Sequence, residues 1–325
     1  MHPAFSVIFL TTLIGAGQGL FLALYTGQLY SAFKVLPVQD SAHYYALGSL
    51  IVLVLLAAGL LSSFFHLGRP ERAWRAAARW RTSWLSREVI VLPAFTAMVA
   101  AWGLIHYLGW NPVLFTISGV YEIDLSLLLG AIATLLCFTL FLCTGMIYAC
   151  IKQLQEWATP LTVINYTMFG ISSGFMLATA FATWQGSGLS DFFGGWTIFA
   201  TLVAFVTRAA SLIRNARIKP KSSMETAIGI RHSRIEQKAQ GSMAGSFNTR
   251  EFFHGASKRK FKSVKWVFLV LVFPVPLLLL SIGLATQAIS LLLGAFLIQY
   301  VGLLAERWFF FAQANHPQNL YYQTV

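Results

Sequence analysis

The feature that most constrains this chain is a series of eight apolar runs, each long enough to cross a bilayer as a helix. A transmembrane helix needs roughly 20 consecutive apolar residues and satisfies its backbone hydrogen bonds internally. Charged residues make up 10% of the 325-residue chain, whereas soluble domains carry about 25%. We expect an all-α polytopic membrane protein, with eight transmembrane helices bundled in a single integral membrane domain over residues 1–325. The expected spans lie near residues 5–33, 45–66, 89–108, 125–149, 160–184, 195–213, 266–286 and 288–311.

The distribution of lysine and arginine predicts the orientation of these spans. With eight spans, both termini and the loops after the second, fourth and sixth spans share one side of the membrane. That side holds 22 of the 23 basic residues, and only Lys34 lies opposite. Because cytoplasmic loops carry the excess of lysine and arginine in membrane proteins, we expect both termini in the cytoplasm.

The two faces differ in what they could bind. The loops on the sparsely charged side are short and mildly acidic, so we expect any large partner on the basic, cytoplasmic side. The longest loop there, residues 214–262, is rich in Ser, Gly, Lys and Arg, a composition typical of segments that are partly disordered or that wrap a partner. Topology and lipid headgroups explain basic residues on one membrane face better than nucleic acid does, so we expect no nucleic-acid partner.

The titratable residues exclude several kinds of chemistry. Cys137, Cys143 and Cys150 lie on or at the end of the fourth span without metal-ligand spacing, and we interpret them as small buried apolar residues. The seven histidines lie in loops or at helix ends, whereas a transmembrane haem needs axial ligands that face each other inside the bundle. The sequence contains no Gly-rich nucleotide fingerprint. We therefore expect neither a metal site nor a haem in this chain.

A transporter is the main alternative from another class. Ion-coupled transporters keep ionisable residues and broken helices near the membrane midplane. Here the ionisable residues nearest to a span are Glu88, Arg208, Glu306 and Arg307, all expected at helix ends, and only residues 273–276 (FPVP) interrupt a span. A redox or structural role on one face fits these positions better than a pathway across the membrane. A purely structural anchor and a cytochrome remain further alternatives.

Residues 64–88, FFHLGRPERAWRAAARWRTSWLSRE, carry six arginines directly after the second span. Proline suits the first position of a helix and glutamate suits its positive end, so Pro70 and Glu71 predict a short helix here. At 100° per residue, Arg72, Arg75 and Arg79 share one wedge of that helix. The pattern predicts an interfacial helix with tryptophans toward lipid and arginines toward water or a partner.

His66 ends the apolar run at headgroup depth, and Gly68 frees the backbone to turn. The arginines can be explained without any chemistry, as residues that fix the orientation of the second span in the membrane. This role does not explain the histidine. Imidazole titrates near neutral pH. At an interface, His66 could therefore exchange a proton with a lipid-soluble substrate.

Three segments resemble one known family. Residues 66–88, HLGRPERAWRAAARWRTSWLSRE, resemble the quinone-site signature of the membrane anchor of dimethyl sulfoxide reductase. Residues 306–322, ERWFFFAQANHPQNLYY, resemble the end of the same anchor family. The opening HPAFSVIFLTTLIGAGQGLFLAL is similar in particular to the membrane component of quinone-linked sulfite dehydrogenases. The resemblance covers nearly the whole chain except residues 214–262.

The resemblance implies a three-subunit oxidoreductase of the bacterial inner (cytoplasmic) membrane. A molybdenum-cofactor subunit performs the substrate chemistry, an iron–sulfur subunit transfers the electrons, and the anchor binds ubiquinone or menaquinone without haem. Anchors of the dimethyl sulfoxide reductase type oxidise quinol and hold their catalytic subunits outside the membrane. Sulfite dehydrogenases of this type hold them in the cytoplasm and reduce quinone. Because the charge distribution places the docking side in the cytoplasm, we favour sulfite oxidation and keep the dimethyl sulfoxide reductase type as the alternative.

The resemblance also implies the residues of the quinone site. His66 matches the histidine required for quinol binding, and Gly68 matches the glycine that lets the backbone pass close. Arg72 matches an arginine two places after the proline, Trp74 stands where the family has an aromatic residue, and Glu88 matches an acidic residue of the pocket. We expect His66 to hydrogen-bond a quinone carbonyl and exchange its proton, Arg72 to stabilise the developing negative charge, and Glu88 to relay protons to the cytoplasm.

Two further sets of residues are expected to dock the partner subunit. Arg75 and Arg79 belong to the arginine wedge of the interfacial helix. Aromatic residues after Glu306 are typical of an interfacial belt, but the polar tail that follows is not. We interpret Asn315, His316 and Asn319 as contacts to the iron–sulfur subunit rather than to quinone.

Overall fold

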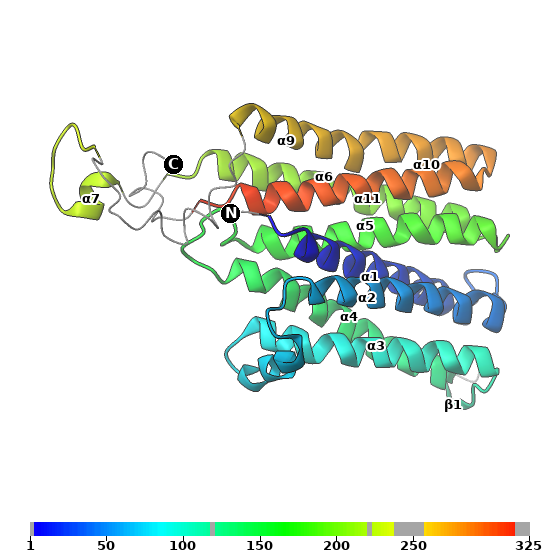
Figure 1. Ribbon diagram of the computed structural model, residues 1–325. Helices are drawn as coiled ribbons and strands as arrows, with labels where there is room; N and C mark the ends of the chain where they lie inside the picture. The colour runs from blue at the N-terminus through cyan, green and yellow to red at the C-terminus, as the bar shows by residue number, and fades with distance from the viewer. Residues whose placement is uncertain (1–2, 118–120, 220–222, 237–256, 316–325) are drawn as a thin grey trace.

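The computed structural model describes residues 3–117, 121–219, 223–236 and 257–315 and forms a bundle of long helices that run side by side (Figure 1). In the described residues, eight helices are long and apolar enough to cross a membrane, which confirms the predicted fold class. The spanning helices are α1 (Phe5–Ala32), α2 (Leu47–Phe64), α3 (Trp84–Leu108), α4 (Leu125–Ala149), α5 (Pro160–Trp184), α6 (Ser190–Ala216), α9 with α10 (Lys258–Val272, Pro274–Thr286) and α11 (Ile289–Ala312).

Capping residues set several of these helix boundaries. Asp124 accepts a hydrogen bond from the backbone N–H of Leu127 at 2.8 Å and begins α4. Thr159 precedes Pro160, the first residue of α5, where a missing N–H costs nothing. Gly109 ends α3 in the left-handed conformation with φ 63°, which glycine adopts without steric cost. The seventh span is divided at Phe273, because the prolines that follow it end one helix and begin the next.

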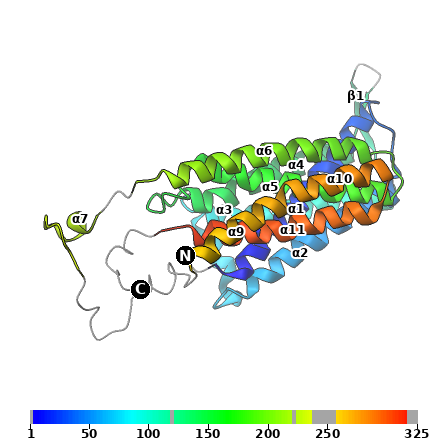
Figure 2. The same cartoon turned by 90° about the horizontal axis from the view of Figure 1, so that it is seen from above.

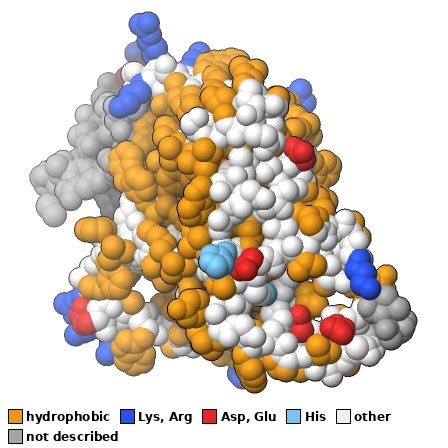
Figure 3. Space-filling model, turned by 90° about the vertical axis from the view of Figure 1, so that its right-hand side faces the viewer, with side chains coloured by type: hydrophobic (Ala, Val, Ile, Leu, Met, Phe, Trp, Pro, Cys, Tyr) orange, Lys and Arg blue, Asp and Glu red, His pale blue; other side chains and the backbone are white. Residues whose placement is uncertain are grey.

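The bundle has two chemically different ends. α1 begins, α2 and α4 end, and α11 ends at one of them, which we call the basic end (Figures 1 and 2). The other, the hairpin end, carries a π-helical turn η1 (Ser41–Ala46) and a two-stranded sheet of β1 (Val113–Ile117) and β2 (Tyr121–Asp124). Viewed from the hairpin end, the surface carries few charged side chains (Figure 3). The sequence indicated only a plain loop over residues 109–124, and the hairpin was not predicted.

The core of the bundle lies around α1, which is the most buried of the spans. α1 and α5 cross so closely that a Cβ atom added at Gly19 would collide with the carbonyl oxygen of Gly170. Hydroxyl pairs join α5 to α6, with Ser172 Oγ 2.8 Å from Thr201 Oγ1 and Thr183 Oγ1 2.8 Å from Ser190 Oγ. Small residues and hydroxyl hydrogen bonds hold transmembrane helices together where lipid offers no hydrophobic driving force.

The segment after α2 differs in detail from the expected interfacial helix. It is a 3₁₀ helix, η2 (Pro70–Arg79), packed against α3. With three residues per turn, positions i and i+3 eclipse, so Arg72 and Arg75 share one face of η2. Arg79 lies about 120° away from Arg72 at that pitch. The expectation that Arg79 belongs to the same wedge was wrong, because it assumed an α-helical period.

The cysteine prediction was right for two residues of three. Cys137 and Cys143 are buried in α4. Cys150 follows the last residue of α4 and is exposed. α4 ends one residue before it, so the turn that follows leaves Cys150 outside the packed helices.

Candidate functional site

His66 lies in the turn that connects α2 to η2 at the basic end. Its backbone N–H donates to the Ser63 carbonyl at 3.2 Å, while its side chain is exposed and makes no hydrogen bond to the described residues. Phe65 beside it is 83% exposed. Partial loss of hydration lowers the pKa of His66 below its usual value, because burial disfavours the imidazolium form. At neutral pH His66 is therefore a neutral imidazole, with one nitrogen that donates and one that accepts.

The face of η2 presents cationic and aromatic side chains. Arg72 is half exposed and lies 3.8 Å from the carboxylate of Glu71, a separation and exposure at which an ion pair contributes little. Trp74 is 71% exposed, and the guanidinium of Arg75 lies 5.6 Å from the centroid of its ring. Gly68 has open space around its α-carbon. Arg72 is consequently available to a ligand or a partner.

Arg87 fixes the corner between η2 and α3. Its Nε and Nη2 atoms donate to the carbonyl oxygens of Trp80 and Arg81 at 2.9 and 2.8 Å, and its guanidinium lies 4.1 Å from the ring centroid of Trp84. In the sequence, Arg87 counted only as one of the basic residues that predict the orientation of the spans. Its position shows that it closes the turn that carries the preceding arginines.

Glu88 points into the bundle rather than toward η2. Thr144 of α4 donates a hydrogen bond to its carboxylate. It lines a cavity of about 20 Å³ together with Gln18 of α1 and Tyr166 of α5. His66 and Arg72 do not line this cavity, and no hydrogen bond or ion pair among the described residues joins them to Glu88. The structure places the three residues at the same end of the bundle, with Glu88 on the inner side.

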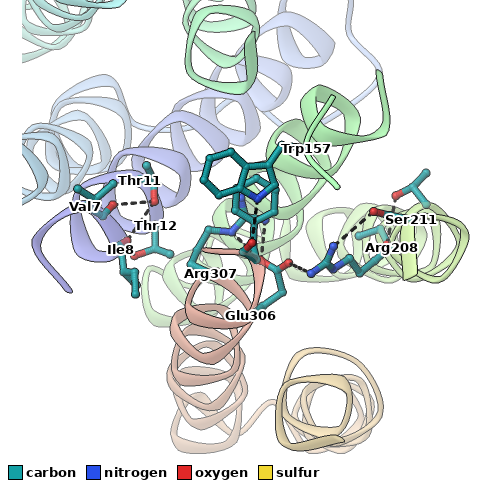
Figure 4. Close-up of polar contacts among 12 residues, drawn as sticks. Val7, Ile8, Thr11, Thr12, Trp157, Arg208, Ser211, Glu306 and Arg307 are labelled. Atoms are coloured by element: carbon teal, nitrogen blue, oxygen red, sulfur yellow. Dashed lines mark hydrogen bonds and ion pairs between the residues drawn. The ribbon is translucent and has the colours of Figure 1, made fainter. Parts of the chain in front are cut away.

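A buried ion cluster lies deeper at the same end, where the sequence predicted only helix ends (Figure 4). The carboxylate of Glu306 of α11 forms ion pairs with Arg208 Nη2 of α6 at 2.7 Å and with Arg307 Nη2 at 2.6 Å, and it accepts a hydrogen bond from Arg307 Nε at 2.6 Å. These three side chains are 0%, 1% and 4% exposed. Arg208 lies eight residues before the end of α6 and Glu306 six residues before the end of α11, so both are near helix ends as expected, but neighbouring helices bury their charges, which was not predicted.

Aromatic rings surround the two arginines of this cluster. Arg307 lies 4.0 Å from the ring centroid of Tyr166, and Arg208 lies 5.5 Å from that of Phe268. Ring faces attract cations, most strongly where water is excluded. The sequence carried one signal for this cluster, since charged residues inside apolar runs are expected to pair with one another, but it could not show which helices supply the partners.

The C-terminal end of α11 is held by the loop between α4 and α5. Trp157 Nε1 donates to the Phe310 carbonyl at 2.9 Å, and the two rings stack with centroids 5.2 Å apart. Asn315 is the last described residue, and its side chain is exposed. His316 and Asn319, the other expected docking residues, lie outside the described residues. Among those that the structure describes, no group of three His, Cys, Asp or Glu side chains could hold a metal ion.

The fold and the site define a class, a multi-pass helical membrane protein with a histidine- and arginine-bearing corner at its basic end. The family of DMSO reductase anchor subunits (DmsC) matches residues 1–322, and the chain belongs to this family. It is also 57% identical, over all 325 residues and the full length of both chains, to a sulfite dehydrogenase subunit of Allochromatium vinosum. Both findings confirm the resemblance that the sequence motifs indicated.

Proposed function

We propose that this chain is the quinone-reactive membrane anchor of a sulfite dehydrogenase complex and passes electrons from an iron–sulfur subunit to a membrane quinone. The observation that carries this assignment is the 57% full-length identity to the sulfite dehydrogenase subunit of Allochromatium vinosum. A molybdenum-cofactor subunit would oxidise sulfite in such a complex. This chain would supply the lipid-facing end of the electron path.

The corner around His66 fits a quinone head group. The His66 side chain makes no hydrogen bond to the described residues and stands beside the exposed ring of Phe65, so a ring arriving from lipid meets an apolar edge and a hydrogen-bond donor. Gly68 leaves space beside the histidine, and Trp74 presents an exposed aromatic face. A bound quinone would supply the two-electron, two-proton redox chemistry that these side chains lack.

Each residue of the corner has a distinct role in this proposal. His66 donates its ring N–H to a quinone carbonyl oxygen and exchanges that proton. Arg72 offers guanidinium N–H donors, and preorganised donors of this kind stabilise negative charge as it develops. Glu88, whose carboxylate lies on the inner side, takes up and releases protons between this corner and the cytoplasm.

The proposed docking face is the basic end. Arg75 carries its charge on the exposed face of η2, and Arg79 extends the basic surface on a second face. The exposed Asn315 lies at the same end, as expected for a contact to the iron–sulfur subunit, and we propose His316 and Asn319 as further contacts. The excess of lysine and arginine supports a cytoplasmic position for this end and for both termini.

Replacement of His66 tests the quinone role. His66→Ala should lower sulfite-driven quinone reduction by about 100-fold or more, because proton transfer by a positioned side chain typically contributes that much. Electron transfer from sulfite to a soluble dye should survive, since the dye accepts from the upstream subunits. Normal quinone turnover in an assembled His66→Ala complex would end the proposal.

A matched pair of arginine variants separates quinone binding from docking. Arg72→Ala should weaken quinone turnover, whereas Arg79→Ala, which lies on another face of η2, should leave it nearly unchanged. Equal losses in both variants, together with poor retention of the iron–sulfur subunit, would assign the arginines to docking instead.

A further inference from the structure

Two small cavities lie next to each other inside the basic end of the bundle, each about 20 Å³ in volume. The first is lined by Glu88, Thr144 and Gln18, and the second by Arg307, together with Thr12 and Ser173. Both are lined by Thr11, Gly15 and Tyr166. The cavities are therefore neighbours, with the Tyr166 side chain on their common wall.

The size and lining of these cavities indicate their content. A cavity needs about 10–15 Å³ and two to four polar partners to hold one water molecule. Each cavity meets both conditions, since hydroxyl, amide, carboxylate and guanidinium groups line them. Neither has room for a quinone ring, which agrees with a quinone position on the outer side, near His66.

Two buried polar atoms at this place have no hydrogen bond among the described residues. They are the hydroxyl oxygen of Tyr166 and Nη1 of Arg307. Leaving a buried donor unsatisfied costs about 1–3 kcal/mol, and more for a charged group. Water in the two cavities would satisfy both atoms.

The chemistry of the end groups gives such a water chain a direction. A guanidinium has donors and no acceptor, whereas an ionised carboxylate only accepts. Arg307 can therefore only donate into the chain, and the carboxyl oxygens of Glu88 can accept at the other end, where Thr144 already donates to one of them. Hydrogen bonds to the charged form of a carboxyl group favour that form, and chains of hydrogen bonds polarise one another in a low-dielectric interior.

We propose that water fills both cavities and joins Arg307, Tyr166 and Glu88 in one hydrogen-bonded chain that holds Glu88 as a carboxylate until quinone chemistry delivers a proton to it. The step is a proton transfer only, in which the carboxylate becomes the neutral acid and later returns the same proton. The use of this step in turnover rests on the proposed function, whereas the chain and the ionised state of Glu88 do not.

The other groups around Glu88 are compatible with this chain. Arg87 precedes it on α3 and is engaged by two backbone carbonyls. Cys143, which precedes Thr144 on α4, and Tyr148, one helical turn beyond Thr144, are a thiol and a phenol, which carry no charge at neutral pH. η2, which also packs against α3, brings arginines that are exposed to solvent. Among the residues that line the two cavities, Arg307 carries the positive charge; it lines the second cavity, whereas Glu88 lines the first.

Infrared spectroscopy of the purified complex tests the chain without any turnover. The infrared bands of the Glu88 carboxyl group are found by subtraction. The spectrum of a protein that carries Glu88→Gln is subtracted from the spectrum of the same protein with Glu88 intact. At neutral pH this difference should show carboxylate bands and no protonated-carboxyl band in the wild-type background. In a Tyr166→Phe background, which removes the shared hydroxyl, the protonated-carboxyl band should appear.

Tyr25→Phe is the matched control. It removes a buried tyrosine hydroxyl that donates to the Leu127 carbonyl at 2.9 Å, and neither residue lines a cavity of the pair, so the Glu88 bands should stay as in the wild type. A protonated Glu88 already in the wild type would overturn the proposal, as would identical Glu88 bands in the wild-type and Tyr166→Phe backgrounds. Because the spectrum needs no quinone, these outcomes are distinct from normal quinone turnover in His66→Ala, which would overturn the proposed function instead.

Discussion

Glu306→Gln should be strongly destabilising, because one carboxylate neutralises two buried guanidinium groups. Arg208 and Arg307 are 1% and 4% exposed and lie 2.7 and 2.6 Å from the carboxylate oxygens of Glu306. Removing one partner of a buried ion pair costs about 3–5 kcal/mol, since it leaves an uncompensated charge. Here two cations lose their counter-ion, so the upper end of that range applies.

The expected size of the effect can be stated as a melting temperature. With an unfolding entropy of about 2.1 cal/mol/K per residue, each kcal/mol corresponds to about 1.5 °C in a chain of 325 residues, so Glu306→Gln should lower Tm by about 7 °C. The assay is thermal unfolding of the detergent-purified protein, with all variants heated at one scan rate because unfolding of large proteins is often irreversible.

Two further variants provide a control and a rescue for this prediction. Glu71→Gln removes an exposed partner, 3.8 Å from Arg72, and should change Tm little because exposed pairs are worth about 0–1 kcal/mol. Replacing all three members of the cluster by apolar residues should recover much of the loss, since a buried ion set can often be exchanged for apolar packing at small cost. A Glu306→Gln protein that melts with the wild type would refute the reasoning, as would a triple variant less stable than Glu306→Gln.

Three other predictions concern packing, topology and pH. Gly19→Val should destabilise the α1–α5 crossing by about 1–3 kcal/mol or more, because the valine side chain would meet the Gly170 carbonyl. Gly195→Ala should not destabilise the protein, because no atom lies close to the added Cβ. Comparison of the Tm values of the two variants checks this. An alkaline-phosphatase reporter fused after Val325 should be inactive, and an active fusion would place the C-terminus outside. Because the pKa of His66 is lowered in the folded protein, the unfolded chain binds a proton at a higher pH than the folded chain does. This residue should therefore reduce the free energy of unfolding as pH falls below about 6.5. An NMR titration of His66 in the folded protein with a midpoint above that value would contradict the lowered pKa.

The spans could be predicted because their signal is local. Each apolar run is long enough to cross a bilayer regardless of its neighbours, and FPVP marks the division of the seventh span at Phe273 in the same way. The placement of η2 after α2 also followed from sequence, through Pro70 and Glu71. Its 3₁₀ geometry did not, because the arginine spacing is compatible with more than one helical period, and only the structure separates Arg79 from Arg72.

The interior of the basic end could not be predicted, because it depends on which helices meet. Arg208 and Glu306 are about 100 residues apart, and no local pattern pairs them. The inward direction of Glu88 likewise depends on Thr144 of a neighbouring helix. The family motifs identified His66, Arg72 and Glu88 as a set but could not show that Glu88 faces cavities shared with Tyr166.

The most direct test of the central claim is the reaction of the wild-type complex, purified through a tag on this chain and supplied with sulfite and a quinone but no soluble dye. Sulfite oxidation releases two electrons, so the account predicts one quinone reduced for each sulfite consumed, and no quinone reduction by the catalytic and iron–sulfur subunits without this chain. A purified complex that fails to oxidise sulfite, or that reduces quinone equally well without this chain, would contradict it.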